Sequence, residues 1–359
     1  MTISEGLQAA VSRGEIAGAV ALVTDENETL YLEAEGLSNV AENERMSTDA
    51  LFCIASMTKP ITAAAVLMLQ DEGKLSLDDH LEKHLPEFTQ LKNAAGERVS
   101  LSLRQCLAHT SGMSDVSLEE ENTAVKLADL IPMILEKPTL FNPGERWEYC
   151  QTSINMAAHV VEVISGKSFP EFLEERFFGP LGMKDTSFYP SEAQADRLAR
   201  CYSRTESGEW RDDGWSWITH DRMMDRSRYP KANAGLFSTA SDYALFCRML
   251  LKKGEVEGRR YLSEEAIQEM QSVQSGDLET GFTPGNAWGV GCCLVRHPQG
   301  ATEGLSPGSF GHGGLYGTQA WIDPIAGKAH VLMMQRADFD NADASDVRSE
   351  FHRSACLLD

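Results

Sequence analysis

The tetrapeptide Ser56-Met57-Thr58-Lys59 places a hydroxyl and an amine three residues apart. At the start of a helix, this spacing brings the two side chains to one face, about one turn apart. An amine held there could take the hydroxyl proton if burial or a nearby positive charge lowered its pKa. The helix N-terminus would add positive potential where negative charge develops on a carbonyl substrate. For an isolated Ser-x-x-Lys pair, the simpler interpretation is a capping Ser56 and a solvated Lys59.

Two further segments carry groups suited to the same chemistry. Tyr149 precedes a predicted helix, and a loop tyrosine near a cation could shuttle a proton, although an isolated one is expected to pack at an interface. Residues 310–317 are glycine-rich and lead directly into a predicted strand. Such glycines let a ligand or a second backbone come close, and an edge strand there could present N–H groups to a bound acyl chain.

Together, these segments resemble the motifs of the class C β-lactamase-like serine hydrolases, which include penicillin-binding carboxypeptidases, D-aminopeptidases, D-amino-acid amidases and family VIII esterases. The family motifs Ser-x-x-Lys, Tyr-x-Asn and Lys/His-x-Gly correspond to residues 56–59, 149–151 and 312–314. Other phrases typical of the family occur in order at residues 106–112, 180–186, 235–242 and 321–324. The resemblance therefore covers nearly the whole chain.

The resemblance implies a role for each motif residue. Ser56 would be the nucleophile, with Lys59 and Tyr149 sharing the general acid and base roles. The backbone N–H groups of Ser56 and Leu315 would form the oxyanion hole, where each donor contributes on the order of 3 kcal/mol to the transition state. Which of Lys59 and Tyr149 deprotonates Ser56 stays open. The other substrate-binding residues that it implies are Gln151, His312, Gly313 and Gly314.

Two residues depart from the family motifs. Gln151 stands where asparagine is usual, so its amide is one methylene longer and the placement of the substrate is affected. His312 stands where β-lactamases of this class carry lysine, and it replaces a permanent cation by a group with an unperturbed pKa of about 6.5. A β-lactam carboxylate would be held less firmly. Histidine is familiar in the peptidase, amidase and esterase branches, so we expect a substrate other than an antibiotic.

The elements that must position these residues are predicted from hydrophobic periodicity. Residues 17–24 and 29–35 have the composition of two strands around a polar turn, so an antiparallel hairpin is expected to open the fold. A helix is predicted from about Ser56 to Gly73, and another over residues 154–164. Strand-like runs return at residues 287–295, 317–322 and 329–334.

Strands at both ends of the chain predict an α/β (α+β) fold of the β-lactamase and penicillin-binding-protein type. One antiparallel sheet flanked by helices would be assembled from residues 1–78 and 226–359, and a mainly helical lobe of residues 79–225 would be inserted. Residues 186–229 are polar and predict a partly irregular excursion. Its tryptophans at positions 210, 215 and 217 either form an apolar wall over the acyl site or pack the lobe.

The composition of the chain limits the kinds of molecule that it is expected to bind. The chain has 359 residues, 42% of them hydrophobic, which is enough for a substantial core. A net charge of −22 repels phosphate backbones and anionic lipids, so we expect neither a nucleic-acid nor a membrane partner. The eight cysteines form no Cys-x-x-Cys pair, which favours a reducing cytoplasm. Acyl transfer of this kind needs no metal and no organic cofactor, and we expect none.

Three other groups have structural alternatives. His80 and His84 could form a two-histidine metal face on a helix, but the run is charge-rich and a solvated turn explains it. His109 could look catalytic beside Ser111, whereas the resemblance makes it a structural brace. Asn233 either lines the pocket or caps a strand end.

We therefore expect an acyl-transfer hydrolase that forms an acyl-enzyme on Ser56. Carboxylesterase activity on short acyl esters ranks first, because esters have good leaving groups. D-amino-acid amidase, D-aminopeptidase or D-Ala carboxypeptidase-like activity ranks second, and slow β-lactam hydrolysis ranks third. The alternative from another class is a binding protein that keeps the fold without the chemistry, against which the intact Ser56, Lys59 and Tyr149 count.

Overall fold

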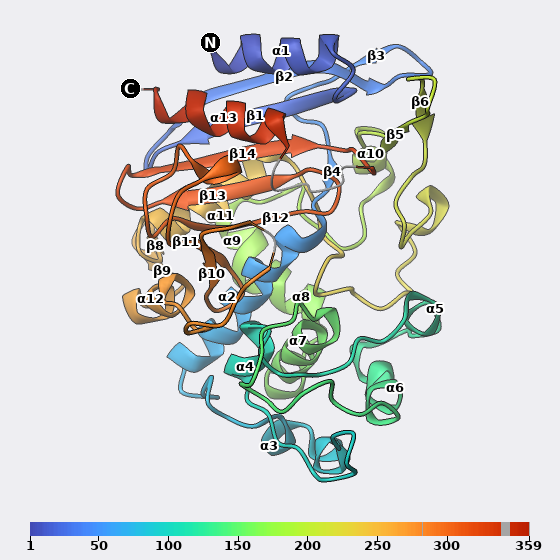
Figure 1. Cartoon of the computed structure of the whole chain (residues 1–359), viewed down its shortest axis with the longest axis vertical. Helices are drawn as coiled ribbons and strands as arrows, with labels where there is room; N and C mark the ends of the chain where they lie inside the picture. Colours follow the sequence, from blue (N-terminus) through green and yellow to red (C-terminus); the bar gives the residue numbers. More distant parts are fainter. Residues whose placement is uncertain (282, 339–344, 359) are drawn as a thin grey trace.

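The computed structural model describes residues 1–281, 283–338 and 345–358. Its main element is an antiparallel eight-stranded sheet in the order β10-β11-β12-β13-β14-β1-β2-β3 (Figure 1). Strands β1 and β14 pair directly, so the two ends of the chain share one sheet, as predicted. The strands from these two ends are β1 (Gly18–Thr24), β2 (Thr29–Asn39), β3 (Glu44–Arg45), β10 (Asn286–Trp288), β11 (Cys293–Val295), β12 (Phe310–Gly313), β13 (Gln319–Asp323) and β14 (Lys328–Met334).

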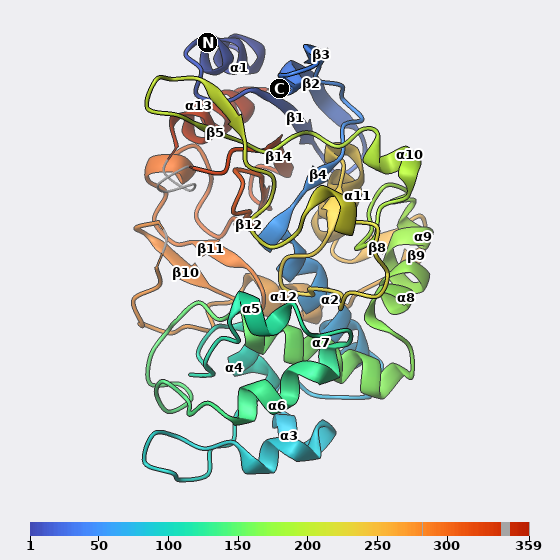
Figure 2. The same ribbon diagram turned by 90° about the vertical axis from the view of Figure 1, so that its right-hand side faces the viewer.

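Strand β1 is buried along its whole length, because both faces of the sheet are covered. Val20 and Leu22 point into a core that also contains residues of α11 (Ala240–Leu251) and α2 (Thr58–Asp71). The alternate residues of β1 point into a second core with α1 (Ile3–Ser12) and α13 (Asp346–Cys356). Helices α1 and α13 pack side by side at the end of the molecule that also holds both termini (Figures 1 and 2).

The two long helices predicted around the motifs are confirmed. Helix α2 follows a short 3-10 turn, η1 (Ala55–Met57), and the chain leaves it through Gly73 at a φ of 67°. Helix α7 (Gln151–Ser165) ends at Gly166, which has a φ of 70°. Helix α2 packs against α7 and is buried from Thr58 to Leu69, so it forms the central support of the molecule.

The shorter helical elements between α2 and the last strands are α3 (Leu81–His84), η2 (Pro86–Gln90), α4 (Leu103–Leu107), α5 (Leu118–Glu121), η3 (Leu127–Asp129), α6 (Leu130–Leu135), α8 (Phe169–Leu173), η4 (Glu174–Phe178), α9 (Gly179–Leu181), α10 (Glu192–Ala195), η5 (His220–Arg222), α12 (Glu264–Gln271) and η6 (Gly300–Thr302). Of these, α3, α4, α5 and α6 lie at the end of the molecule opposite the termini, whereas α10 lies nearer the termini (Figure 2). The boundaries expected at residues 78/79 and 225/226 stay a prediction.

Two predictions about the elements are wrong. The hairpin does not open the fold, because α1 precedes it; the Thr2 side chain caps that helix and Leu7 packs in the core beneath it. The run at 287–295 is two strands, β10 and β11, joined by a turn with Gly291 at a φ of 68°. A Cβ atom on Gly291 would lie 2.4 Å from the Ala63 side chain, so α2 approaches this turn too closely for any residue but glycine.

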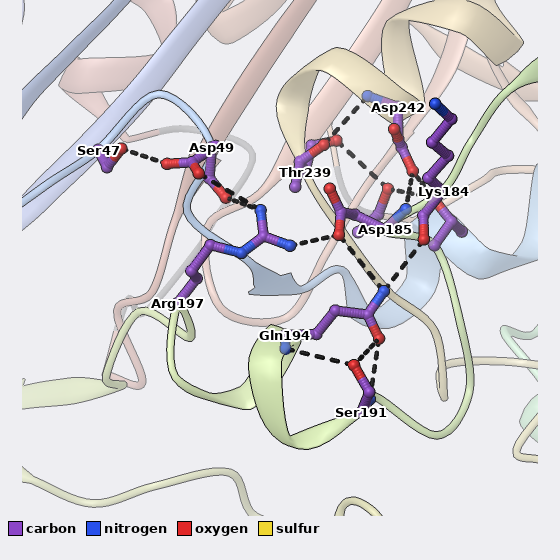
Figure 3. A network of polar contacts seen from close by, with 11 residues as sticks. Ser47, Asp49, Lys184, Asp185, Ser191, Gln194, Arg197, Thr239 and Asp242 are labelled. Carbon is purple, nitrogen blue, oxygen red and sulfur yellow. Dashed lines mark hydrogen bonds and ion pairs between the residues drawn. The ribbon is translucent and has the colours of Figure 1, made fainter.

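The excursion at residues 186–229 is largely irregular, as expected. Its regular parts are α10, η5 and a small ladder of β5 (Tyr202–Arg204) and β6 (Trp210–Asp212). The start of this excursion lies beside β4 (Phe52–Cys53), which pairs with β7 (Phe237–Ser238) and leads into η1. A polar network fastens it there (Figure 3). Arg197 donates to the Asp49 carbonyl at 2.8 Å and pairs with Asp185, whose own N–H donates to the Asp242 carboxylate at 2.7 Å.

The Asp242 carboxyl gives this network a pH dependence. Burial raises its pKa to about 6. Hydrogen bonds from Asp185 and Thr186 lower the pKa and offset only part of the effect of burial. The folded protein therefore binds the proton more tightly than the unfolded chain, and the stability contributed by Asp242 falls as pH rises from about 4 to about 6. We expect the unfolding free energy of the wild type, measured relative to Asp242→Asn, to decrease across that window. A difference that does not change with pH would contradict this interpretation.

Candidate active site

Ser56 lies where strand β4 gives way to helix α2. The residue before it, Ala55, has a φ of 43°, a left-handed conformation that is uncommon for a residue other than glycine. This bend turns the chain sharply from the strand into the 3-10 turn, and the Ser56 side chain lines a cavity. The local backbone thus presents the hydroxyl at the N-terminal end of α2, as the sequence predicts.

The amine of Lys59 is fully buried and has three polar neighbours. Nζ lies 3.0 Å from Ser56 Oγ, 2.8 Å from Gln151 Oε1 and 2.9 Å from the carbonyl oxygen of Asn233. Burial lowers the pKa of Lys59 well below its ordinary value; the Asp115 carboxylate opposes this shift, and Lys231 adds to it. A neutral amine has two N–H donors and one lone pair, which match two carbonyl oxygens and one hydroxyl. The three N–H donors of an ammonium match the same three oxygens, so the contacts suit both forms of the amine, and burial favours the neutral one.

Tyr149 lies on the other side of Lys59. The centre of its ring is 4.6 Å from Lys59 Nζ, and its hydroxyl is 3.3 Å from His312 Nε2. His109 is buried against the Tyr149 ring, with 4.4 Å between the ring centres, and its Nδ1 accepts from the Cys150 N–H at 3.0 Å. The structural role expected for His109 agrees with these contacts, because they fix the loop that carries Tyr149.

The longer side chain of Gln151 still reaches Lys59. Its Oε1 also accepts from the Asn233 side-chain amide at 2.7 Å. At the start of α7, the backbone N–H groups of Gln151 and Thr152 both donate to Asp115 Oδ1 at 2.8 Å. Of the two alternatives for Asn233, the structure favours the pocket, because Asn233 lines the cavity. Its contact with Lys59 could not be predicted from residue types, because that contact uses a backbone carbonyl.

The glycine-rich segment lies beside the serine, although β12 is not an edge strand as expected. It runs between β11 and β13, and β11 pairs only with Phe310 and Gly311. His312 and Gly313 pair with β13 alone among the described strands, so this end of β12 has an open side. A Cβ on Gly314 would lie 2.6 Å from the Ile54 carbonyl oxygen, a close approach that requires glycine. The following residue, Leu315, lines the same cavity as Ser56.

His312 is neutral in this environment. Burial lowers its pKa to about 3, and the nearby Lys59 adds to the shift. His312 Nδ1 lies 2.6 Å from the Gly313 carbonyl oxygen, which can only accept, so Nδ1 carries the proton. Nε2 is then an acceptor for the Tyr149 hydroxyl. The position that holds a lysine in class C β-lactamases therefore carries no charge here.

The cavity has a volume of about 670 Å³ and mainly apolar walls. Among the described residues of its lining, Glu121 is the acidic side chain and Lys231 the lysine, and they form an ion pair with each other. Of the three tryptophans in the excursion, Trp217 lines the cavity, whereas Trp215 packs in a neighbouring hydrophobic cluster and Trp210 against Tyr202. The large apolar residues of the wall are Val116, Leu118, Trp217, Trp288, Leu315 and Trp321.

The remaining candidates lie away from this site. His84 Nε2 is 2.9 Å from Asp79 Oδ2, and His80 Nδ1 contacts Ser100 Oγ, so the two histidines have separate partners. Across residues 1–281, 283–338 and 345–358, no group of three or more His, Cys, Asp or Glu side chains is placed to hold a metal ion. Within the same ranges, no helix combines the length and apolar character needed to cross a membrane. All eight cysteines are free thiols.

The neutral state of His312 can be measured directly. Because its pKa is lowered to about 3, its ring should not titrate in a histidine-side-chain NMR experiment between about pH 5 and 8. The resonance should be assigned with a His312→Gln variant. A His312 titration midpoint near the ordinary value of 6.5 would contradict the electrostatics described here.

Comparisons with known proteins identify the family to which the chain belongs. A family model described as Beta-lactamase matches residues 3–353. Protein Rv1367c of Mycobacterium tuberculosis is 30% identical over 92% of this chain and 89% of its own length. Esterase EstB of Burkholderia gladioli is 27% identical over 91% of this chain and 88% of its own.

Among solved structures, EstCE1, described as a hydrolase with promiscuous acyltransferase activity, superposes with a TM-score of 0.82 at 22% identity. The match covers 99% of this chain and 97% of EstCE1, and it confirms the expected fold. With the family model spanning almost all of the sequence, the chain belongs to the beta-lactamase family of serine hydrolases.

Proposed function

We propose that the protein is a carboxylesterase that hydrolyses short acyl esters through an acyl-enzyme on Ser56. The observation that carries this proposal is the placement of Lys59, whose buried Nζ lies 3.0 Å from Ser56 Oγ and has two carbonyl acceptors for its own N–H groups. When the amine is neutral and donates to the two carbonyls, its lone pair faces the serine hydroxyl. Lys59 is therefore the base that we assign to the first proton transfer.

In the proposed reaction, Ser56 Oγ attacks the ester carbonyl carbon while its proton passes to Lys59 Nζ. The carbonyl oxygen becomes an oxyanion that accepts hydrogen bonds from the backbone N–H groups of Ser56 and Leu315. When the tetrahedral intermediate collapses, the alkoxide leaves and takes the proton from Lys59 through the Tyr149 hydroxyl. Water then attacks the acyl-enzyme by the same steps, releases the acid and restores Ser56.

The electrostatics of the cavity support a neutral substrate. The proposed oxyanion donors adjoin mainly apolar walls, and the Glu121–Lys231 pair leaves neither a carboxylate nor an ammonium of the described lining without a counter-charge. A β-lactam carboxylate or the free ammonium of a D-amino-acid amide would lose its hydration here without gaining an ionic partner. Esters avoid this cost. The name of the relative EstB also supports the choice of an ester.

The first test is the loss of ester turnover in Ser56→Ala. We expect kcat for p-nitrophenyl butyrate to fall on the order of 10⁵-fold or more, because the nucleophile is removed. The matched control is Ser111→Ala, a buried serine two residues from His109, which should keep its turnover. D-alanine amide and nitrocefin are assayed in parallel and should react more slowly than the ester. Ester turnover that persists in Ser56→Ala would reject the proposed nucleophile.

The second test restores a cation at position 312. We expect His312→Lys to raise the affinity for carboxylate-bearing β-lactams such as nitrocefin by about tenfold, because a charge-assisted hydrogen bond is worth about 1.5 kcal/mol. His312→Met has a side chain of similar length without the charge and is the control. If binding by the lysine variant is unchanged or weaker relative to the methionine variant, the explanation for a neutral substrate is wrong.

A further inference from the structure

A side chain of helix α13 contacts the turn that carries Leu315, one of the two proposed oxyanion donors. We propose that Arg348, on this helix, is a positioning residue that orients and polarises the peptide group between Gly314 and Leu315. This inference rests on the proposed function, in which the N–H of that peptide donates to the oxyanion. Arg348 itself does not reach the substrate in this account and acts through the peptide alone.

Arg348 is fully buried, and its guanidinium group donates to three backbone carbonyls of one turn. Nη2 lies 3.3 Å from the Gly314 oxygen and 3.2 Å from the Thr318 oxygen, and Nε lies 3.2 Å from the Gly317 oxygen. Burying a guanidinium costs free energy that an apolar side chain of similar volume would not. Packing α13 against the sheet therefore does not by itself account for an arginine at this position.

The geometry of the peptide bond connects these contacts to the reaction. The carbonyl of Gly314 and the N–H of Leu315 belong to one planar trans peptide, in which the C=O and N–H bonds point in opposite directions. A guanidinium on the oxygen therefore fixes the direction of the N–H on the other side. It also draws electron density toward the oxygen, which strengthens the N–H as a donor. The Gly317 N–H also donates to the Gly314 oxygen, at 3.1 Å, so the guanidinium reinforces the aim that the turn gives the proposed donor and adds the charge that strengthens it.

The same turn is tied to the segment that precedes the nucleophile. The Gly314 N–H donates to the Thr318 oxygen at 2.6 Å, and the Thr318 hydroxyl donates to the Ile54 oxygen at 3.3 Å. Ile54 lies two residues before Ser56. Arg348 therefore fastens a rigid turn whose other side rests on the nucleophile segment, so a loss of Arg348 changes the position of Leu315 relative to Ser56.

The test compares Arg348→Ala and Arg348→Lys with the wild type. The oxyanion forms only in the transition state, so we expect kcat for the ester to fall by about tenfold to a hundredfold in Arg348→Ala while KM changes little. Arg348→Lys keeps the positive charge but lacks the forked donors of the guanidinium group. Its kcat should therefore lie between those of the wild type and Arg348→Ala. Added guanidinium ion, well below denaturing concentrations, should restore part of the kcat of Arg348→Ala.

The matched control is Phe351→Leu, a buried residue of the same helix that packs in the core between α13 and the sheet. It should lower the melting temperature while leaving kcat within about twofold, because it does not touch the turn. A folded Arg348→Ala variant with the kcat of the wild type would overturn the inference. So would an Arg348→Ala variant that has the same melting temperature as Phe351→Leu and loses no more kcat than Phe351→Leu does.

This result is separable from the proposed function. If Ser56→Ala removes ester turnover but Arg348→Ala does not reduce it, the esterase stands and the role of Arg348 fails. If the wild type turns over no ester, the esterase proposal fails, and the rate at which an alkyl fluorophosphonate labels Ser56 replaces kcat as the readout. Slower labelling of Arg348→Ala than of Phe351→Leu would then support the inference, and equal rates would overturn it.

Discussion

The amine of Lys59 is fully buried, so the surrounding protein groups have to satisfy its hydrogen-bonding capacity. Its neighbours come from three places far apart in the sequence: Ser56 at the start of α2, Gln151 at the start of α7, and a backbone carbonyl at Asn233. A small shift of any of them would leave a buried N–H or carbonyl without a partner, at a cost of about 1 to 3 kcal/mol. This requirement explains why the site is braced by further polar contacts, including Asp115 at the start of α7 and His109 behind Tyr149.

Burial also decides the charge state of the site. The pKa values of Lys59 and His312 are both lowered chiefly by burial, and each group lowers the pKa of nearby bases when it is charged. In a protein with a net charge of −22, burial therefore disfavours positive charge on both of these basic groups of the reaction centre. The apolar walls of the cavity fit the same pattern. Together, these properties favour the ester proposal over reactions whose substrates must be held by an ionic group.

The parts of the site that follow from local spacing could be predicted from the sequence. Ser56 and Lys59 are one helical turn apart, and the helix patterns that carry them and Gln151 are strong. Two other features could not be predicted. The contact of the Asn233 carbonyl does not depend on residue type, because every residue has a backbone carbonyl. The open side of β12 depends on where its pairing with β11 stops. Arg348 lies 31 residues beyond Gly317, in a charge-rich helix that we did not predict, so its contact with the turn is purely tertiary. Helix α1 was also not predicted, because its buried face is short and its hydrophobic pattern is therefore brief.

The central claim is that ester turnover passes through a covalent intermediate on Ser56, and mass spectrometry after rapid quenching tests it most directly. Wild-type protein would be mixed with p-nitrophenyl butyrate, quenched in acid within the first turnover, digested and analysed by peptide. The account predicts a butyryl group on the Ser56 hydroxyl, which appears as p-nitrophenol is released and disappears as substrate is exhausted. Turnover without an acylated peptide, or an acyl group on a different residue that forms and decays at the rate of turnover, would contradict it.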